Sequence, residues 1–231
     1  MKFNKIAIIL SLSVFIFACS SDKSELIEET QLYNSFVIES MEHITSTLQL
    51  PTALTTSQNT YAQKTVKKYQ DITTIFSAVV ALLKESTTSS FMNLTPKSGL
   101  YYWVSNELYP NSLVEVELMI TEESDRYAFI LTLKEAQQSI DLIRGYTLKN
   151  ENTGAFFLED PAHYLEWHDS HQKNIVLSMT TAVSRCMLTQ NKNENSGQIE
   201  EFAGPNYFAT YSWSSNGSGI VNYENGDRFS W

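Results

Sequence analysis

The sequence predicts an α+β protein in which an N-terminal antiparallel helical hairpin is followed by a curved antiparallel β-meander or incomplete barrel. Three observations lead to this fold class. Apolar residues recur every three or four positions across residues 25–90, which is the period of amphipathic helices. They alternate with polar residues across 91–231, which is the period of half-buried strands. No helix-length segment separates most of these strands, so parallel βαβ units are disfavoured.

The composition sets outer limits on function. The 231 residues include 16 Lys and Arg against 26 Asp and Glu, a formal charge of −10, and 42% of them are hydrophobic. This apolar content excludes a wholly disordered chain. The acidic balance disfavours nucleic acid as a partner, because nucleic-acid binders normally present a basic face. Two cysteines are too few for a disulfide-rich scaffold.

Residues 1–18 have the features of a secretory signal. Two lysines precede Ile6–Phe17, an almost unbroken apolar run of twelve residues. Such a run is shorter than the roughly 20 residues of a membrane-spanning helix, but it fits the apolar region of a signal peptide. The run ends at Ile16-Phe17-Ala18-Cys19, which resembles the lipobox of bacterial lipoproteins. Phe17 departs from that pattern, since a smaller residue is commoner there.

The lipoprotein resemblance implies a membrane anchor. It implies that the Cys19 thiol receives a diacylglycerol, that cleavage precedes Cys19 and that the new amino group is acylated, since one acyl chain holds a protein only marginally. Residues 19–24 would be the lipidated cysteine and a polar tether. Ser20, where an Asp would favour inner-membrane retention, implies the cell outer membrane, with its periplasmic or external face left open. The alternative is an ordinary signal peptide with a chance cysteine.

Residues 25–90 are expected to form the helical hairpin. The first helix begins near Ser24 and ends at Pro51, because the residue before a proline is pushed out of the helical conformation. The second helix runs from about Ser57 to about Glu85, and the short loop between the two favours an antiparallel pair. We expect their apolar stripes to cover the sheet; the alternative is that they dock a partner.

Residues 91–231 are expected to form the antiparallel β domain. The dipeptides Asn216-Gly217 and Asn225-Gly226 are strong hairpin signals, because both residue types accept positive φ. About ten short strands predict curling or closure of the sheet. The terminal Phe229-Ser230-Trp231 resembles the last strand of outer-membrane β-barrels, but several strands are shorter than the roughly 9–11 residues that cross a bilayer.

One cluster has the residue types of a metal site. Three of the four histidines lie between His163 and His171. On a strand, Glu166 and His168 would share a face, and imidazole with carboxylate suits zinc. The spacing matches no metal-binding signature, so we expect no metal and no cofactor. The low-ranked candidate ligands are His163, Glu166, His168 and His171.

No catalytic residue is assigned. Cys186 lies in the apolar stretch Arg185-Cys186-Met187-Leu188, which favours a buried inert thiol over a nucleophile. The sequence has no Gly-x-Ser-x-Gly elbow, phosphate loop or dinucleotide fingerprint.

Aromatic residues are the remaining functional signal, because they either pack the sheet, which we favour, or line a pocket for an apolar or sugar-like ligand. They are Tyr101, Tyr102, Trp103, Tyr146, Trp167, Tyr207, Tyr211, Trp213, Tyr223, Phe229 and Trp231. The sequence does not specify an activity. We predict a non-enzymatic, lipid-anchored envelope protein that binds a hydrophobic small molecule, an envelope component or an envelope protein. A metal-dependent hydrolase using His163–His171 and an accessory subunit of an outer-membrane machine remain as alternatives.

Overall fold

The structure is a computed structural model that describes residues 38–88, 100–105, 114–135, 138–149, 151–158, 162–170 and 173–231. These residues belong to two compact units. The first unit comprises residues up to 42 together with 77–149, and the second comprises 43–76 together with 150–231. The signal peptide, Cys19 and the tether predicted from the sequence lie outside the described residues.

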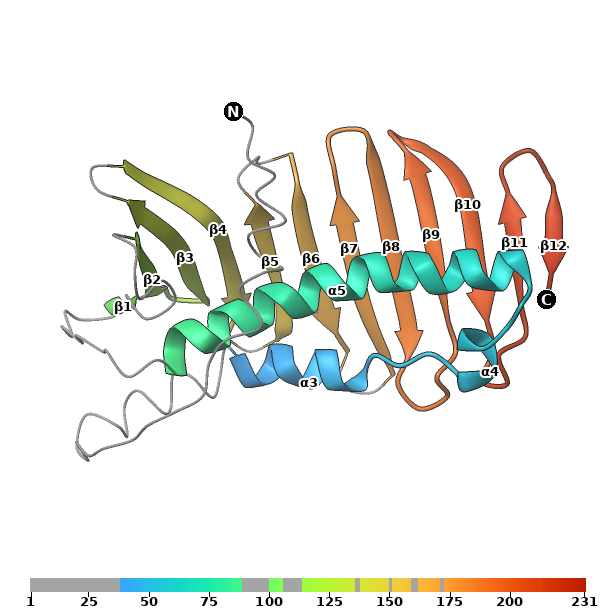
Figure 1. Ribbon diagram of the computed structural model, residues 1–231, viewed down its shortest axis with the longest axis horizontal. Helices are drawn as coiled ribbons and strands as arrows, with labels where there is room; N and C mark the ends of the chain where they lie inside the picture. The colour runs from blue at the N-terminus through green and yellow to red at the C-terminus, as the bar shows by residue number, and fades with distance from the viewer. Residues whose placement is uncertain are drawn as a thin grey trace. The chain divides into compact units, whose positions relative to one another are not determined.

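The first unit contains four antiparallel strands that pair in chain order (Figure 1). Leu118 lies opposite Leu131, and both are buried, as are Phe129 and Ile143. The alternating polar positions face outward, where Lys134 forms an ion pair with the cross-strand Glu117. The strands are β1 (Leu100–Ser105), β2 (Val114–Glu122), β3 (Arg126–Glu135) and β4 (Gln138–Leu148).

The second unit contains eight antiparallel strands, again paired in chain order. Its apolar residues alternate along each strand, so that Leu165 and Trp167 on one strand and Ile175 and Leu177 on the next are all buried. The strands are β5 (Asn152–Leu158), β6 (Tyr164–Asp169), β7 (Asn174–Thr180), β8 (Ser184–Asn191), β9 (Gly197–Ala203), β10 (Asn206–Trp213), β11 (Gly219–Tyr223) and β12 (Arg228–Ser230).

The helices are α3 (Ser40–Thr47), α4 (Thr52–Thr55) and α5 (Thr60–Thr88). Asn59 caps the start of α5, since its side-chain Oδ1 accepts the backbone N–H of Tyr61 at 2.8 Å. No glycine or proline interrupts the 29 residues of α5. No helix among the described residues combines the length and apolarity needed to span a membrane.

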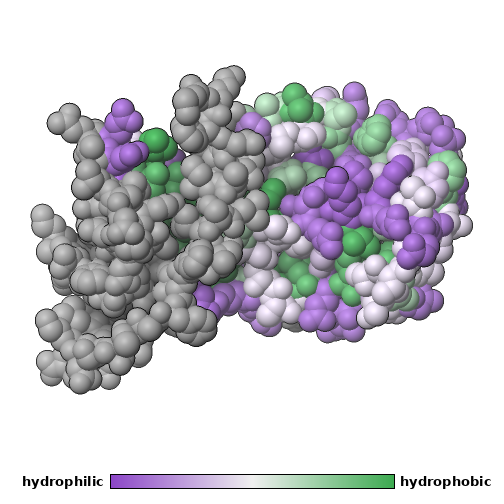
Figure 2. Space-filling view, in the orientation of Figure 1, coloured by the Kyte–Doolittle hydropathy of each residue, from purple (hydrophilic) through white to green (hydrophobic). Residues whose placement is uncertain are grey.

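Within the second unit, α5 lies across the strands (Figure 1). The ring of Tyr61 stacks on Phe229 of β12 with centroids 4.4 Å apart, and Phe76 contacts Trp167 of β6 at 5.8 Å. Between them, the hydroxyl of Tyr69 donates to Gln190 Oε1 of β8 at 2.9 Å. The apolar stripe of α5 is therefore used for packing on the sheet. Hydrophilic residues cover much of its outward side (Figure 2).

The predicted α+β class with a helical hairpin is wrong. The described residues form mainly an open antiparallel β-meander, and within neither unit do the first and last strands pair to close an incomplete barrel. A hairpin needs two long helices that bury their stripes against each other, whereas α3 has eight residues and ends at Thr47, before Pro51. The stripe of α5 packs on strand side chains instead, which offer a broader apolar surface. The antiparallel meander itself agrees with the prediction.

Glycine and tryptophan face each other repeatedly in the sheet of the second unit. The opposed pairs are Gly154 with Trp167, Gly197 with Trp213, and Gly219 with Trp213 on one side and Trp231 on the other. The indole N–H of Trp213 donates to the carbonyl of Asn195 at 3.0 Å, and that of Trp231 to the carbonyl of Gly217 at 2.9 Å. Each accepting residue has positive φ and stands two positions before the facing glycine.

Candidate functional site

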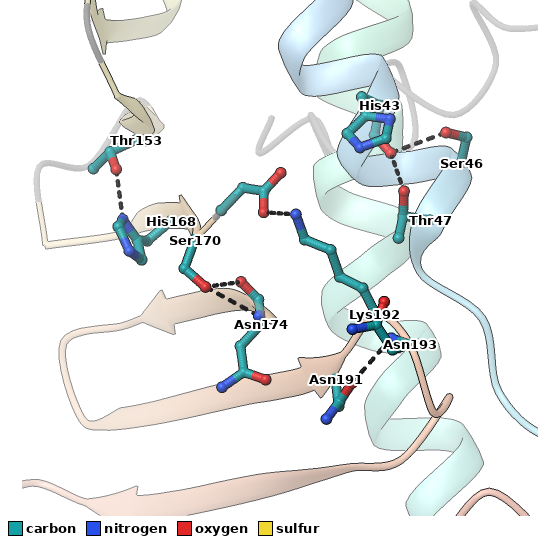
Figure 3. Close-up of polar contacts among 11 residues, drawn as sticks. His43, Ser46, Thr47, Thr153, His168, Ser170, Asn174, Asn191, Lys192 and Asn193 are labelled. Carbon is teal, nitrogen blue, oxygen red and sulfur yellow. Dashed lines mark hydrogen bonds and ion pairs between the residues drawn. The ribbon is translucent and has the colours of Figure 1, made fainter. Parts of the chain in front are cut away.

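The predicted histidine cluster lies around β6. Glu166 and His168 are exposed and alternate with the buried Leu165, Trp167 and Asp169, so the carboxylate and the imidazole lie on the same face of the strand. The imidazole Nδ1 of His168 is 2.6 Å from the hydroxyl of Thr153 on the neighbouring β5 (Figure 3).

The candidate metal ligands do not form a metal site in the part of the chain that the structure describes. No group of three or more His, Cys, Asp or Glu side chains converges there. His163 precedes β6 and is half-buried, and His171 lies outside the described residues. A zinc site normally needs at least three converging protein ligands. The described geometry therefore gives no support to metal chemistry at His163, Glu166 and His168.

A buried ion pair occupies the end of β6. The side chain of Asp169 is 1% exposed, and the ammonium of Lys192, which is 14% exposed, contacts its Oδ1. Lys192 follows β8, and its backbone N–H donates to the carbonyl of Lys173 at 2.9 Å. Burying either charge alone would be costly, so the two groups stabilise each other only together. The ion pair links the β8–β9 turn to β6, and because it is buried it leaves no open site for a ligand.

Cys186 lies on β8 and is not part of a disulfide. Burial, with a smaller contribution from the carboxylate of Glu201, raises the pKa of the Cys186 thiol to about 12. A thiol must lose its proton to act as a nucleophile, so this one is inert at neutral pH. Cys186 is half-buried, and its raised pKa disfavours a role as a nucleophile.

An open pocket of about 370 Å³ lies beside β10 and the β11–β12 hairpin. Two aromatic rings, two carboxylates and one amide line it: Phe208, Tyr223, Glu224, Asn225 and Asp227. The rings of Phe208 and Tyr223 are nearly perpendicular, at 82°, with centroids 6.1 Å apart. They form a corner rather than a flat platform.

A bulge in β10 positions the aromatic part of this pocket. The pairing of β10 with β9 shifts by one residue between Tyr207 and Ala209, which leaves Phe208 outside the regular register. Its side chain is 48% exposed, while its carbonyl accepts the backbone N–H of Glu224 at 3.0 Å. This bond ties the bulge to the β11–β12 hairpin, so the local backbone holds the ring beside the two carboxylates.

The polar part of the pocket comes from a three-residue turn. Gly226 has φ of +88°, and its N–H donates to the carbonyl of Tyr223 at 3.0 Å, which closes the turn. The Asn225 amide Nδ2 donates to Asp227 Oδ2 at 2.8 Å, and Asn225 Oδ1 accepts the Asp227 backbone N–H at 3.0 Å. The amide oxygen and one amide hydrogen are thus bonded within the turn, while the carboxylate of Glu224 is exposed.

The hydroxyl of Tyr223 is held in place by a hydrogen bond with Tyr211. Burial, followed by a hydrogen bond with Tyr223, raises the pKa of the Tyr211 hydroxyl. The ring of Tyr223 packs edge-on against Tyr211 and Phe229, with centroids 6.3 and 6.2 Å away. Its neighbours therefore fix the ring before any ligand arrives.

Tyr223 and the Asn225-Gly226 turn were singled out from the sequence, but Phe208, Glu224 and Asp227 were not predicted as lining residues. The turn contained a usable signal, since a hairpin places the residues that flank it close together. The bulge at Phe208 had no such signal. A regular strand would have given Phe208 the same face as Thr210 and Ser212.

No protein-family model, curated protein or solved structure matches this chain.

Proposed function

We propose that this chain is a non-enzymatic binding protein, held at the cell outer membrane by lipid on Cys19, and that the pocket beside β10 and the β11–β12 hairpin is its ligand site. The observation that supports binding most directly is the pair of perpendicular rings, one of them fixed by its neighbours, next to two carboxylates. Apolar surface with a few placed polar groups is the usual composition of a small-molecule site.

The chemistry of the remaining candidates favours binding over catalysis. The Cys186 thiol keeps its proton at neutral pH, and His168 lies at hydrogen-bond distance from Thr153. The partner-docking alternative relied on an exposed helical stripe, but Tyr69 and Phe76 of α5 are buried in the second unit. The pocket remains as the feature of that unit best suited to recognition.

The lipid anchor rests on the lipobox resemblance at Ile16–Cys19 and has its own test. Cells fed a radiolabelled fatty acid are expected to label the wild-type protein and to leave Cys19→Ser unlabelled. The labelled protein is expected in the outer-membrane fraction. An unlabelled wild-type protein that fractionates like the variant would remove the anchor from the proposal.

Binding is tested by native mass spectrometry of the full-length protein purified in mild detergent. A bound small molecule is expected on the wild type and absent from Phe208→Ala, which removes the exposed ring. Val183→Ala is the matched control, because Val183 is also an exposed apolar residue but does not line the pocket. The proposal fails if wild type and Phe208→Ala carry the same molecule, or if neither carries any.

A further inference from the structure

The rim of the pocket is negatively charged, and few hydrogen-bond donors line it. Glu224 and Asp227 contribute two carboxylates, and no lysine, arginine or histidine is among the lining residues. The side-chain amide of Asn225 donates within the turn, to Asp227. The lining therefore offers a ligand mainly carboxylate oxygen and aromatic surface. An anionic ligand would meet repulsion here, whereas a cation would meet attraction.

The two aromatic rings of the pocket favour one class of cation. The face of an aromatic ring carries partial negative charge and attracts an ammonium group within about 6 Å of its centroid. Phe208 and Tyr223 both line the pocket and pack edge to face, so aromatic surface borders the space that an alkylated ammonium would occupy. A sugar ring prefers one flat surface to stack on, and a bare metal ion needs three or more converging oxygen or nitrogen ligands. Among the described residues, no group of three or more His, Cys, Asp or Glu side chains converges, so the pocket is better suited to an organic cation than to a metal ion.

We propose, building on the binding function above, that the pocket takes a small alkylated ammonium group of the choline type. Phe208 and Tyr223 supply cation–π contacts, and Glu224 and Asp227 supply the countercharge. The volume of about 370 Å³ lies at the small end of ligand sites, which span roughly 300–1,000 Å³. The same group occurs free and as a phospholipid headgroup, and both sources share this chemistry.

The test is isothermal titration calorimetry, in which choline chloride is titrated into the full-length protein in detergent. The neutral isostere 3,3-dimethylbutan-1-ol has the same shape without the charge. We expect saturable choline binding and at least about fivefold weaker binding of the isostere, the ratio expected for about 1 kcal/mol of cation–π attraction. Equal affinities for the two would overturn the cationic ligand class and leave the binding function standing.

Variants localise the site. Glu224→Gln and Phe208→Ala are each expected to weaken choline binding, while Glu194→Gln, which changes a carboxylate in the β8–β9 turn, leaves it unchanged. If Phe208→Ala does not fold, Phe208→Leu keeps an apolar side chain but has no aromatic face, and it is expected to lose binding as well. Choline binding that survives both Glu224→Gln and Phe208→Leu would overturn the assignment to this pocket.

Phosphatidylcholine vesicles separate the two sources. Vesicle capture that free choline competes away would identify the headgroup as the ligand, and free choline binding without vesicle capture would identify the soluble cation. No choline binding in either form overturns the inference. The mass-spectrometric comparison of wild type with Phe208→Ala then decides whether the binding function fails with it.

Discussion

The indole of Trp213 fills the space that a side chain at Gly197 would need, since a Cβ on Gly197 would lie 2.6 Å from the ring atom Cζ2. The same Cβ would lie 2.6 Å from the carbonyl oxygen of Thr189, a backbone atom that cannot move aside without disturbing β8. Gly197→Ala is therefore expected to lower the free energy of unfolding by about 1–3 kcal/mol, the usual cost of overpacking. Urea denaturation measures this change.

Ser215→Ala, an exposed turn substitution, is the control for Gly197→Ala and should change the free energy of unfolding by less than about 0.5 kcal/mol. An unchanged denaturation midpoint for Gly197→Ala would mean that the indole of Trp213 does not occupy this space.

Tyr69→Phe is expected to destabilise the second unit. The substitution removes the hydroxyl that donates to Gln190 Oε1 and leaves a buried acceptor without its partner, at a cost of about 1–3 kcal/mol. Tyr61→Phe is the matched control on the same helix, because Tyr61 contributes its stacked ring rather than a buried hydroxyl. Thermal unfolding should separate the two variants, and equal melting temperatures would contradict the role given to the Tyr69 hydroxyl.

The ion pair of Asp169 and Lys192 should show strong coupling. Lys192→Met leaves a buried carboxylate unpaired and is expected to lower the free energy of unfolding by about 3 kcal/mol. Asp169→Leu combined with Lys192→Met removes both charges and is expected to recover much of that loss. The check is a double-mutant cycle by urea denaturation, in which additive effects would show that the two groups do not interact.

The thiol of Cys186 should resist alkylation until the protein unfolds. Burial raises its pKa to about 12, against about 8.5 for an exposed thiol. In a Cys19→Ser chain, where Cys186 is the remaining cysteine, iodoacetamide at pH 8.5 should react slowly with the folded protein and quickly in urea. Rapid reaction of the folded protein would show an exposed thiolate.

The raised pKa of the Cys186 thiol also determines how the stability of the folded protein changes with pH. Between about pH 8.5 and 12 the unfolded chain releases the thiol proton while the folded chain keeps it. This contribution to stability is therefore complete below about pH 8.5 and is lost as the pH rises towards 12. Comparing Cys186→Ala with its parent across this range isolates the effect.

The sequence predicted the strands whose apolar residues alternate, such as Val114–Glu122, because burial on one face imposes a two-residue period. It did not predict β9, Gly197–Ala203, as a strand. There Glu201 takes a position on the covered face, where it pairs with Lys68 of α5, so the alternation is broken by a charge. A lysine that lies 133 positions earlier in the chain leaves no local trace in the sequence of β9.

For the helices, the sequence predicted the position of the longest one but not the surface on which it packs. The limits of α5 were predicted to within a few residues, because its apolar period is regular. The partner of its stripe was not predicted, since a periodic stripe shows that a face is buried but not what buries it. For the pocket, the Asn225-Gly226 turn could be predicted from the sequence, whereas the register shift at Phe208 depends on the pairing of β10 with β9.

The arrangement of α5 over the second unit has a consequence for how cooperatively that unit unfolds. Strands that bond only to their sequence neighbours could fray one hairpin at a time, much as stacked repeats do. Here one helix, α5, contacts four of the strands. The contacts are made by Tyr61 to β12, Lys68 to β9, Tyr69 to β8 and Phe76 to β6. Opening an outer hairpin therefore breaks contacts with α5, the helix that the inner strands also contact. Distant strands of the second unit are thereby coupled, and we expect them to unfold in one cooperative transition.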